Sequence, residues 1–155
     1  MRMMLRAATV MAILGTAATG WASDTGTITV SVSLGSVIAV SLDTSTWNIG
    51  PIALGGSNGP ATFTATVGNT ATKLEIAATN GAGGWALGAT AGPDVFVVAV
   101  TNPAIKLTAV NQTLAASVAA YGNKSLALTY GAPTSDTKGG GIDQGFAITV
   151  KASAP

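Results

Sequence analysis

The chain of 155 residues contains no cysteine and no histidine, and its only two arginines are Arg2 and Arg6. The absence of cysteine excludes disulfide bonds, thiol nucleophiles and thiolate metal ligands. The absence of histidine excludes serine triads with an imidazole base, histidine general bases and histidine-ligated zinc sites. The chain therefore cannot build most of the common catalytic and metal-binding residue sets.

Charged residues are also scarce, because they make up 8% of the chain, whereas about 25% is typical of globular proteins. The few lysines are scattered and form no basic stripe, so we expect no nucleic-acid partner. A surface of threonine, serine, asparagine, glycine and alanine has little electrostatic repulsion to keep copies apart. Such a surface is expected on a subunit that its neighbours cover.

The first 22 residues have the layout of a secretory signal peptide. The two arginines form a basic start, residues 7–18 are apolar or small, and Gly20 and Ala22 are small residues at positions −3 and −1 of a cut after Ala22. The alternative is a retained membrane anchor, but a spanning helix needs about 20 apolar residues. We therefore expect a secreted protein with one domain, residues 23–155, and no membrane association after cleavage.

The rest of the chain consists of short runs in which apolar and polar residues alternate, separated by glycine, proline and asparagine. A period of two is typical of a half-buried strand. The sequence predicts an all-β fold of about 8–10 short strands, an antiparallel β-sandwich of Greek-key or jelly-roll type, with a closed barrel as the alternative. The expected strands are 27–34, 38–42, 61–67, 71–79, 85–87, 95–100, 105–107, 125–130 and 146–152, and the first two could also form one long bent strand.

Four segments are less regular. Residues 46–52 contain Pro51, which cannot donate to a strand ladder, so they are expected to form an edge strand or an irregular crossing. Residues 111–120 fit a strand or a short helix, and we favour a strand. Residues 54–60 are predicted as a loop by their composition, and residues 68–70 as a tight hairpin turn.

Large apolar side chains that are in phase with these patterns are expected to anchor the core. They are Trp47, Phe63, Trp85, Leu87, Phe96 and Phe146. The alternative is a sugar-stacking platform made of exposed aromatic residues, namely Trp47, Trp85, Tyr121 and Tyr130. We favour core positions for the two tryptophans, because each alternates with an aliphatic residue on the same face of its segment.

The acidic residues form no recognisable catalytic or metal-binding motif. Every one except Glu75 lies in or beside a predicted loop: Asp24, Asp43, Asp94, Asp136 and Asp143. Asp136 and Asp143 share one loop and could bind a cation together with main-chain carbonyls, but they lack the dense ladder of a calcium loop. We expect solvated loop carboxylates, no cofactor, no metal site and no enzyme activity.

Residues 27–34 (TITVSVSL) can be interpreted in two ways. The strand could pair within its own sandwich, or it could leave its domain and complete the sheet of the next subunit by strand donation. The second interpretation suits a segment that becomes N-terminal after cleavage, alternates cleanly and carries no charge. Its candidate subunit-interface residues are Ile28, Val30, Val32 and Leu34.

The run from Val67 to Val100 is similar to the first motif region of WxL-type bacterial surface domains. It contains an asparagine turn, a Leu-Glu-Ile strand, Trp85-Ala86-Leu87, a Pro-Asp loop and a valine-rich strand. The chain also loosely resembles β-sandwich subunits of secreted biofilm and pilus-like fibres. The final strand lacks the second Trp-x-Leu of the WxL pattern. The resemblance implies an extracellular location and structural or adhesive work.

The sequence favours a structural subunit of an extracellular fibre, pilus-like filament or surface coat, whose partners are other copies of itself. The alternative is a non-catalytic module that binds a cell-wall polymer or another polysaccharide through exposed aromatic residues. An enzyme would need two of the acidic residues within roughly 5–10 Å of each other in a cleft.

Overall fold

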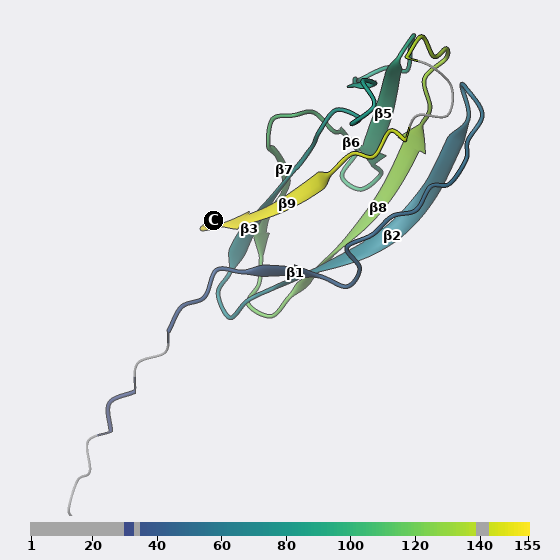
Figure 1. Ribbon diagram of the computed structural model, residues 1–155. Coiled ribbons are helices and arrows are strands. Elements are labelled where there is room, and N and C mark those ends of the chain that lie inside the picture. Colours follow the sequence, from purple (N-terminus) through teal and green to yellow (C-terminus); the bar gives the residue numbers. More distant parts are fainter. Residues whose placement is uncertain (1–29, 33–34, 139–142) are drawn as a thin grey trace, which may run out of the picture. The chain divides into compact units, whose positions relative to one another are not determined.

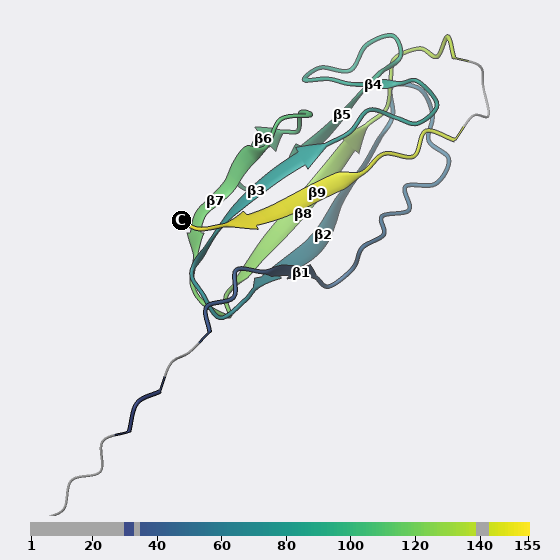
Figure 2. The same ribbon diagram turned by 60° about the vertical axis from the view of Figure 1, so that its left-hand side comes forward.

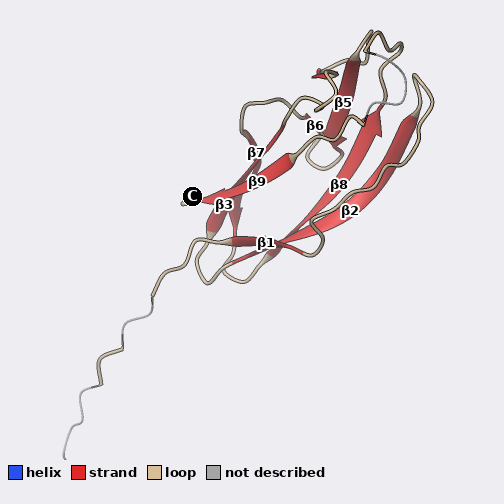
Figure 3. Ribbon diagram, viewed as in Figure 1, coloured by secondary structure: helices blue, strands red, loops and turns tan. Residues whose placement is uncertain are grey.

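The computed structural model describes residues 30–32, 35–138 and 143–155, and the chain divides into two units, residues 1–33 and 34–155. The described part of the second unit consists of strands and loops (Figures 1 and 3). No helix in the described ranges is long and apolar enough to cross a membrane. The strands are β1 (Val40–Leu42), β2 (Ser57–Val67), β3 (Thr72–Ala78), β4 (Ala86–Leu87), β5 (Val95–Val100), β6 (Ile105–Lys106), β7 (Gln112–Val118), β8 (Asn123–Gly131) and β9 (Ile148–Ser153).

The strands form two sheets that pack against each other, which confirms the predicted all-β sandwich. One sheet has the order β1-β2-β8-β5-β4, with β6 beside β5, and the other has the order β7-β3-β9. Figure 2 shows β7, β3 and β9 as one layer in front of β8 and β2. All strand pairs are antiparallel except β4 and β5, which form a short parallel pair that the sequence did not predict.

The core lies between the sheets and follows from the alternation in each strand. Every second residue of β3 is buried, and Lys73 and Glu75 lie on the opposite face, as expected. The valine-rich strand β5 also alternates, because Phe96, Val98 and Val100 are buried and the residues between them are partly buried. Complete burial of one such aliphatic or aromatic side chain is worth roughly 1.5–3 kcal/mol.

The predicted hairpin at residues 68–70 is wrong, because β2 and β3 belong to different sheets. Gly68 instead connects the sheets and bonds to two other segments: its N–H donates to the carbonyl of Ala39 at 3.0 Å, and its carbonyl accepts from the N–H of Tyr121 at 2.8 Å. The residue types at this turn permit a hairpin, but they do not determine which strand pairs with which.

The predicted loop at residues 54–60 is partly wrong, because β2 begins at Ser57. The strand accommodates Pro60 through a register shift between Asn58 and Ala61 in its pairing with β8. Proline is tolerated in a sheet at such a bulge. Gly59 has a φ of 110°, and a Cβ there would lie 2.6 Å from the carbonyl oxygen of Leu128, so this bulge requires glycine.

Two other segments resolve the alternatives left by the sequence. Residues 112–118 form strand β7, not a helix. Residues 43–56 contain no strand, so the segment with Pro51 is an irregular crossing. The strand expected at 38–42 is shortened to β1, which pairs with the end of β2.

Candidate functional site

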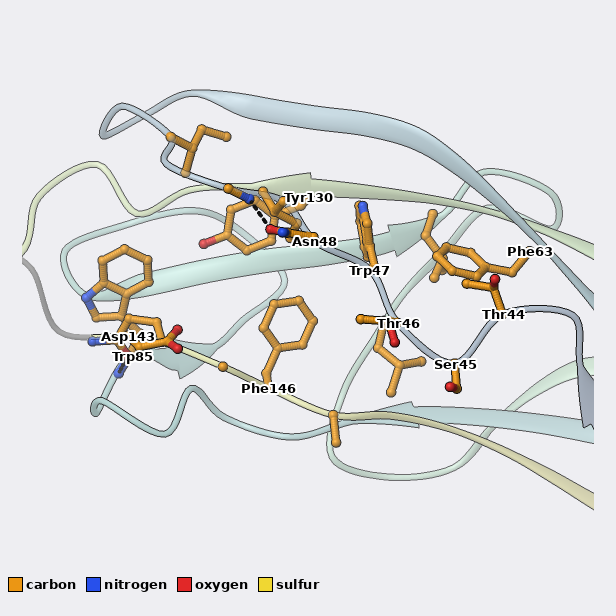
Figure 4. A pocket seen from close by; sticks show the side chains of 18 of the residues that line it. Thr44, Ser45, Thr46, Trp47, Asn48, Phe63, Trp85, Tyr130, Asp143 and Phe146 are labelled. Atoms are coloured by element: carbon orange, nitrogen blue, oxygen red, sulfur yellow. Dashed lines mark hydrogen bonds between the residues drawn. The ribbon is translucent and has the colours of Figure 1, made fainter.

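A groove of about 910 Å³ lies between the two sheets next to β9 (Figure 4). One wall is formed by Phe63 of β2 and by Leu126, Leu128 and Tyr130 of β8. The other wall is formed by Phe146, which precedes β9, and by Ile148 and Val150 of β9. Residues 44–52 run between the two walls, as Figure 4 shows. The groove is therefore an incompletely closed part of the sandwich core.

Aromatic rings line much of this groove. Trp47 meets Phe63 edge to face, with centroids 6.1 Å apart, and Phe146 stacks on Tyr130 at 5.9 Å and packs against Phe96 at 4.9 Å. Burial raises the pKa of the Tyr130 hydroxyl, so this ring is neutral at physiological pH. The groove is consequently apolar and uncharged along these walls.

The segment 44–52 covers the groove by side-chain packing alone. Trp47, Ile49 and Ile52 pack against the core. Among the described residues, its main chain forms no hydrogen bond to the main chain of a strand. Within the segment, the side-chain oxygen of Asn48 accepts a hydrogen bond from the main-chain N–H of Gly50 at 3.0 Å. The segment therefore leaves the neighbouring edge of β9 unpaired.

Trp85 lies at one end of the groove and is fixed by two polar contacts. Its indole N–H donates to Asp136 at 3.1 Å, and its main-chain N–H donates to the side-chain oxygen of Gln144, also at 3.1 Å. The buried side-chain nitrogen of Gln144 has no hydrogen-bond partner among the described residues. A polar acceptor that entered this end of the groove could satisfy that nitrogen.

Asp94 and Asp136 have structural contacts, which corrects the expectation that both are simply solvated. Asp94 accepts bonds from the hydroxyl and the N–H of Thr137 and lies 3.7 Å from the ammonium of Lys138. The Thr137 hydroxyl, followed by its N–H, lowers the pKa of Asp94 below the ordinary value of an aspartate. Asp136 also accepts the N–H of Lys138 at 2.8 Å, two residues on, which is an Asx turn that its residue type could have indicated.

Asp43 and Glu75 also have structural contacts, whereas Asp24 lies outside the described residues. Asp43 accepts the N–H of Thr64 at 3.0 Å, which lowers its pKa, and Glu75 pairs with Lys73 at 2.8 Å, whose hydrogen bond lowers the pKa of Glu75. Within the described ranges, no three acidic residues group in a way that could hold a metal ion. The sequence proposal of a cation at Asp136 and Asp143 gains no support from this arrangement.

Of the six proposed core anchors, Phe96 is fully buried, whereas the others are partly buried and pack against the core: Trp47, Phe63, Trp85, Leu87 and Phe146. Tyr121 is exposed and is not among the residues that line the groove. The structure thus brings both tryptophans and Tyr130 to one groove, but it does not place Tyr121 with them.

The described part of the N-terminal segment is exposed and lies outside any strand. Val30 is 74% exposed and Val32 is 78% exposed. Ile28 and Leu34 lie outside the described residues. The chain enters the sandwich at Gly35, where the side chain of Asn69 accepts the N–H of Val37 and donates to the carbonyl of Gly35, both at 2.7 Å. Sequence reasoning assigned Asn69 to a turn and missed this contact.

Comparisons of the chain with protein-family models, with curated proteins and with solved structures find no match. They carry no argument for or against the resemblance to WxL-type or fibre-forming domains. The function has to be inferred from the groove, the strand edges and the N-terminal segment.

Proposed function

We propose that this protein is a secreted structural subunit that assembles with copies of itself into an extracellular fibre or coat, and that residues 27–34 are donated between subunits. The observation that carries this proposal is the exposure of Val30 and Val32, which are 74% and 78% exposed in a segment that alternates as a strand does. Such residues are stabilised when a partner removes them from water.

The second support is the low charge of the chain, and in particular of residues 27–34. Charged residues that usually protect strand edges from association are missing from residues 27–34. A strand of this kind is an aggregation hazard when free, and it becomes an assembly element when a specific partner edge accepts it. Main-chain hydrogen bonds would then hold the subunits, and the alternate side chains would set the register.

The test compares two double variants of the secreted protein. Val30→Asp with Val32→Asp places two charges on the apolar face of the segment, and Thr29→Asp with Ser31→Asp places the same charges on its polar face. We expect the wild type and the second variant to form filaments or sheets by electron microscopy and light scattering, and the first variant to stay monomeric. Unchanged assembly of the first variant contradicts strand donation, and a monomeric wild type contradicts the structural role.

A second candidate is a module that binds polysaccharide, and the aromatic groove favours it. Trp47, Trp85 and Tyr130 line one groove whose end holds the unpartnered amide nitrogen of Gln144. Tryptophan fluorescence titrated with cell-wall fragments and soluble glycans tests this function. A Trp85→Phe variant should weaken any binding, whereas Tyr121→Phe, at an exposed position outside the groove, should not. A glycan response that survives in Trp85→Phe contradicts the use of this groove.

A further inference from the structure

We propose that the acceptor of the donated strand is the free edge of β9, and that residues 27–34 of a second copy pair with this edge while their apolar side chains enter the groove. This inference rests on the proposed function and adds the place where subunits join. It predicts that the three-stranded sheet β7-β3-β9 gains a fourth strand on the β9 side.

Paired residues of β3 and β9 differ in burial. Leu74, Ile76 and Ala78 of β3 are opposite Ala152, Val150 and Ile148 of β9 and share their inward face. The three β3 residues are fully buried, whereas all three β9 residues remain only partly buried. The inward face of this sheet is thus less completely covered at β9 than at β3. Among the described residues, β9 has no second partner strand.

The two edges of this sheet differ in regularity. The pairing of β3 with β7 shifts register twice, between Thr72 and Leu74 and between Leu74 and Glu75. Bulges of this kind twist an edge and protect it from further pairing. The pairing of β3 with β9 runs through six consecutive residue pairs without a shift. The β9 edge is therefore the regular one that can template another strand.

One protective feature is present on β9, but it does not block the groove. Lys151 is opposite Glu75 and is exposed, so it belongs to the outer face of the sheet. Its charge contributes to lowering the pKa of Glu75. The inward residues Ile148 and Val150 carry no charge, and the aromatic and aliphatic walls of the groove beside them are apolar, whereas Asp136, Asp143 and Gln144 also line it.

The donor segment and the groove are complementary in polarity and size. The donor segment alternates Ile28, Val30, Val32 and Leu34 with threonine and serine, so one face is aliphatic and the other is polar and uncharged. The groove has about 910 Å³ of space beside residues 44–52, near the upper end of the roughly 300–1,000 Å³ that ligand pockets occupy. A row of aliphatic side chains can enter it, and the strand backbone can pair with β9.

The geometry of the chain entry favours a second copy over the same chain. Asn69 binds Gly35 and Val37 at once, and the hydroxyls of Ser36 and Thr70 are 2.6 Å apart. These contacts tie residues 35–37 to the connection between β2 and β3. Pairing of residues 27–34 with β9 of their own domain would require the chain to reverse direction beside these tied residues, whereas pairing with a second copy requires no reversal.

Cysteine cross-linking tests this acceptor cleanly, because the chain has no cysteine of its own. Ser31→Cys is combined with Lys151→Cys on β9 or, as the matched control, with Thr113→Cys on β7. Lys151 of β9 and Thr113 of β7 are both paired with Glu75 of the central strand β3. The two cysteine combinations therefore differ only in which edge strand they probe. Thr29→Cys and Ser33→Cys, each with Lys151→Cys, cover neighbouring registers, since directly opposite Cβ atoms are about 4.5–5.5 Å apart.

We expect at least one Lys151→Cys pair to give a ladder of covalent oligomers that a reductant collapses to monomer, and the Thr113→Cys pair to give none. Filaments that form without any Lys151→Cys ladder, or with a Thr113→Cys ladder, overturn the β9 acceptor while the structural function stands. A cross-linked band of monomer size shows that the strand returns to its own domain and overturns the second copy. Absence of any assembly in the wild type overturns the proposed function itself.

Hydrogen exchange provides a measurement that needs no cysteine. Amides of β9 that face its free edge should exchange at least tenfold more slowly in wild-type filaments than in the monomeric Val30→Asp, Val32→Asp variant. Amides at the free edge of β7 should exchange equally in both. Equal exchange on β9 in the two states contradicts the acceptor.

Discussion

The side-chain oxygen of Asn69 accepts a hydrogen bond from the main-chain N–H of Val37 at 2.7 Å, and its nitrogen donates to the carbonyl of Gly35 at the same distance. One amide side chain thereby replaces a strand partner for the residues that enter the sandwich. Because these contacts are exposed, each is worth about 1 kcal/mol or less. Asn69 therefore positions the chain entry more than it stabilises the fold.

We predict that Asn69→Ala leaves the free energy of unfolding within about 1 kcal/mol of wild type but raises the exchange rate of the Val37 amide and the rate of proteolysis between residues 30 and 39. Asn111→Ala, at an exposed position, is the control and should change neither. Native-state hydrogen exchange and limited proteolysis measure these effects. An unchanged Val37 exchange rate in Asn69→Ala would mean that the side chain does not hold the entry.

Gly68 lies beside this contact and is predicted to tolerate no side chain. A Cβ at this position would lie 2.5 Å from the carbonyl oxygen of Val37, which is a main-chain atom that cannot rotate away. Gly68→Ala should therefore destabilise the fold by about 1–3 kcal/mol, measured by urea unfolding. Gly145→Ala is the control, because a Cβ there meets no atom within 4 Å. Equal stability of the two variants would contradict the close approach of residues 37 and 68.

The acid stability of the protein should depend on Asp94. The hydroxyl and N–H of Thr137, with a smaller effect of Lys138, lower the pKa of Asp94 below its ordinary value in the folded state. A lowered folded pKa contributes stability above the unfolded pKa of about 3.9, and this stability is lost as the pH falls through the folded pKa. Asp43 and Glu75 shift in the same direction, so stability should decline below about pH 4.

Asp94→Asn should consequently have a lower Tm than wild type at pH 7 and a smaller loss of Tm between pH 5 and pH 2. The measurement is thermal unfolding followed by circular dichroism across this range. Asp143→Asn, an exposed position in the same part of the chain, is the control and should follow the wild-type curve. Parallel curves for Asp94→Asn and wild type would show that the Thr137 contacts contribute no pH-dependent stability.

The alternation in the sequence predicted which side chains face the core, and the reason is local. In β3 the inward residues Leu74, Ile76 and Ala78 are the ones expected from a period of two, because successive side chains of a strand point to opposite faces. Residues 111–120 fit a strand or a short helix by their pattern, and the structure forms strand β7 there. Neither conclusion depends on which strands are neighbours.

Strand pairing could not be predicted in the same way, because it depends on contacts far apart in the sequence. Gly68 and Asn69 suit a hairpin, yet their main-chain and side-chain partners are Ala39, Tyr121, Gly35 and Val37. The groove was also missed, since it arises where residues 44–52 fail to pair with β9. That outcome depends on the relative positions of two sheets and leaves no signal in either segment alone.

The last prediction concerns Val150, whose cost of truncation should depend on assembly. Val98 is fully buried in β5, whereas Val150 is only partly buried on β9. In the monomeric Val30→Asp, Val32→Asp background, Val98→Ala should cost about 2 kcal/mol of unfolding free energy and Val150→Ala roughly half as much or less, because exposed methyl groups contribute little. Urea unfolding monitored by tryptophan fluorescence measures both values.

In the protein that assembles, we expect Val150→Ala to reduce the stability of the filament more than Val98→Ala does. Val150→Ala should lower the temperature at which filaments dissociate, because a donated strand would bury this side chain against the groove, whereas Val98→Ala should act mainly on unfolding of the dissociated subunit. Light scattering during heating separates dissociation from unfolding. If Val150→Ala already costs as much as Val98→Ala in the monomer, the β9 edge is covered before any strand arrives, and the unpaired edge cannot be what drives subunits together.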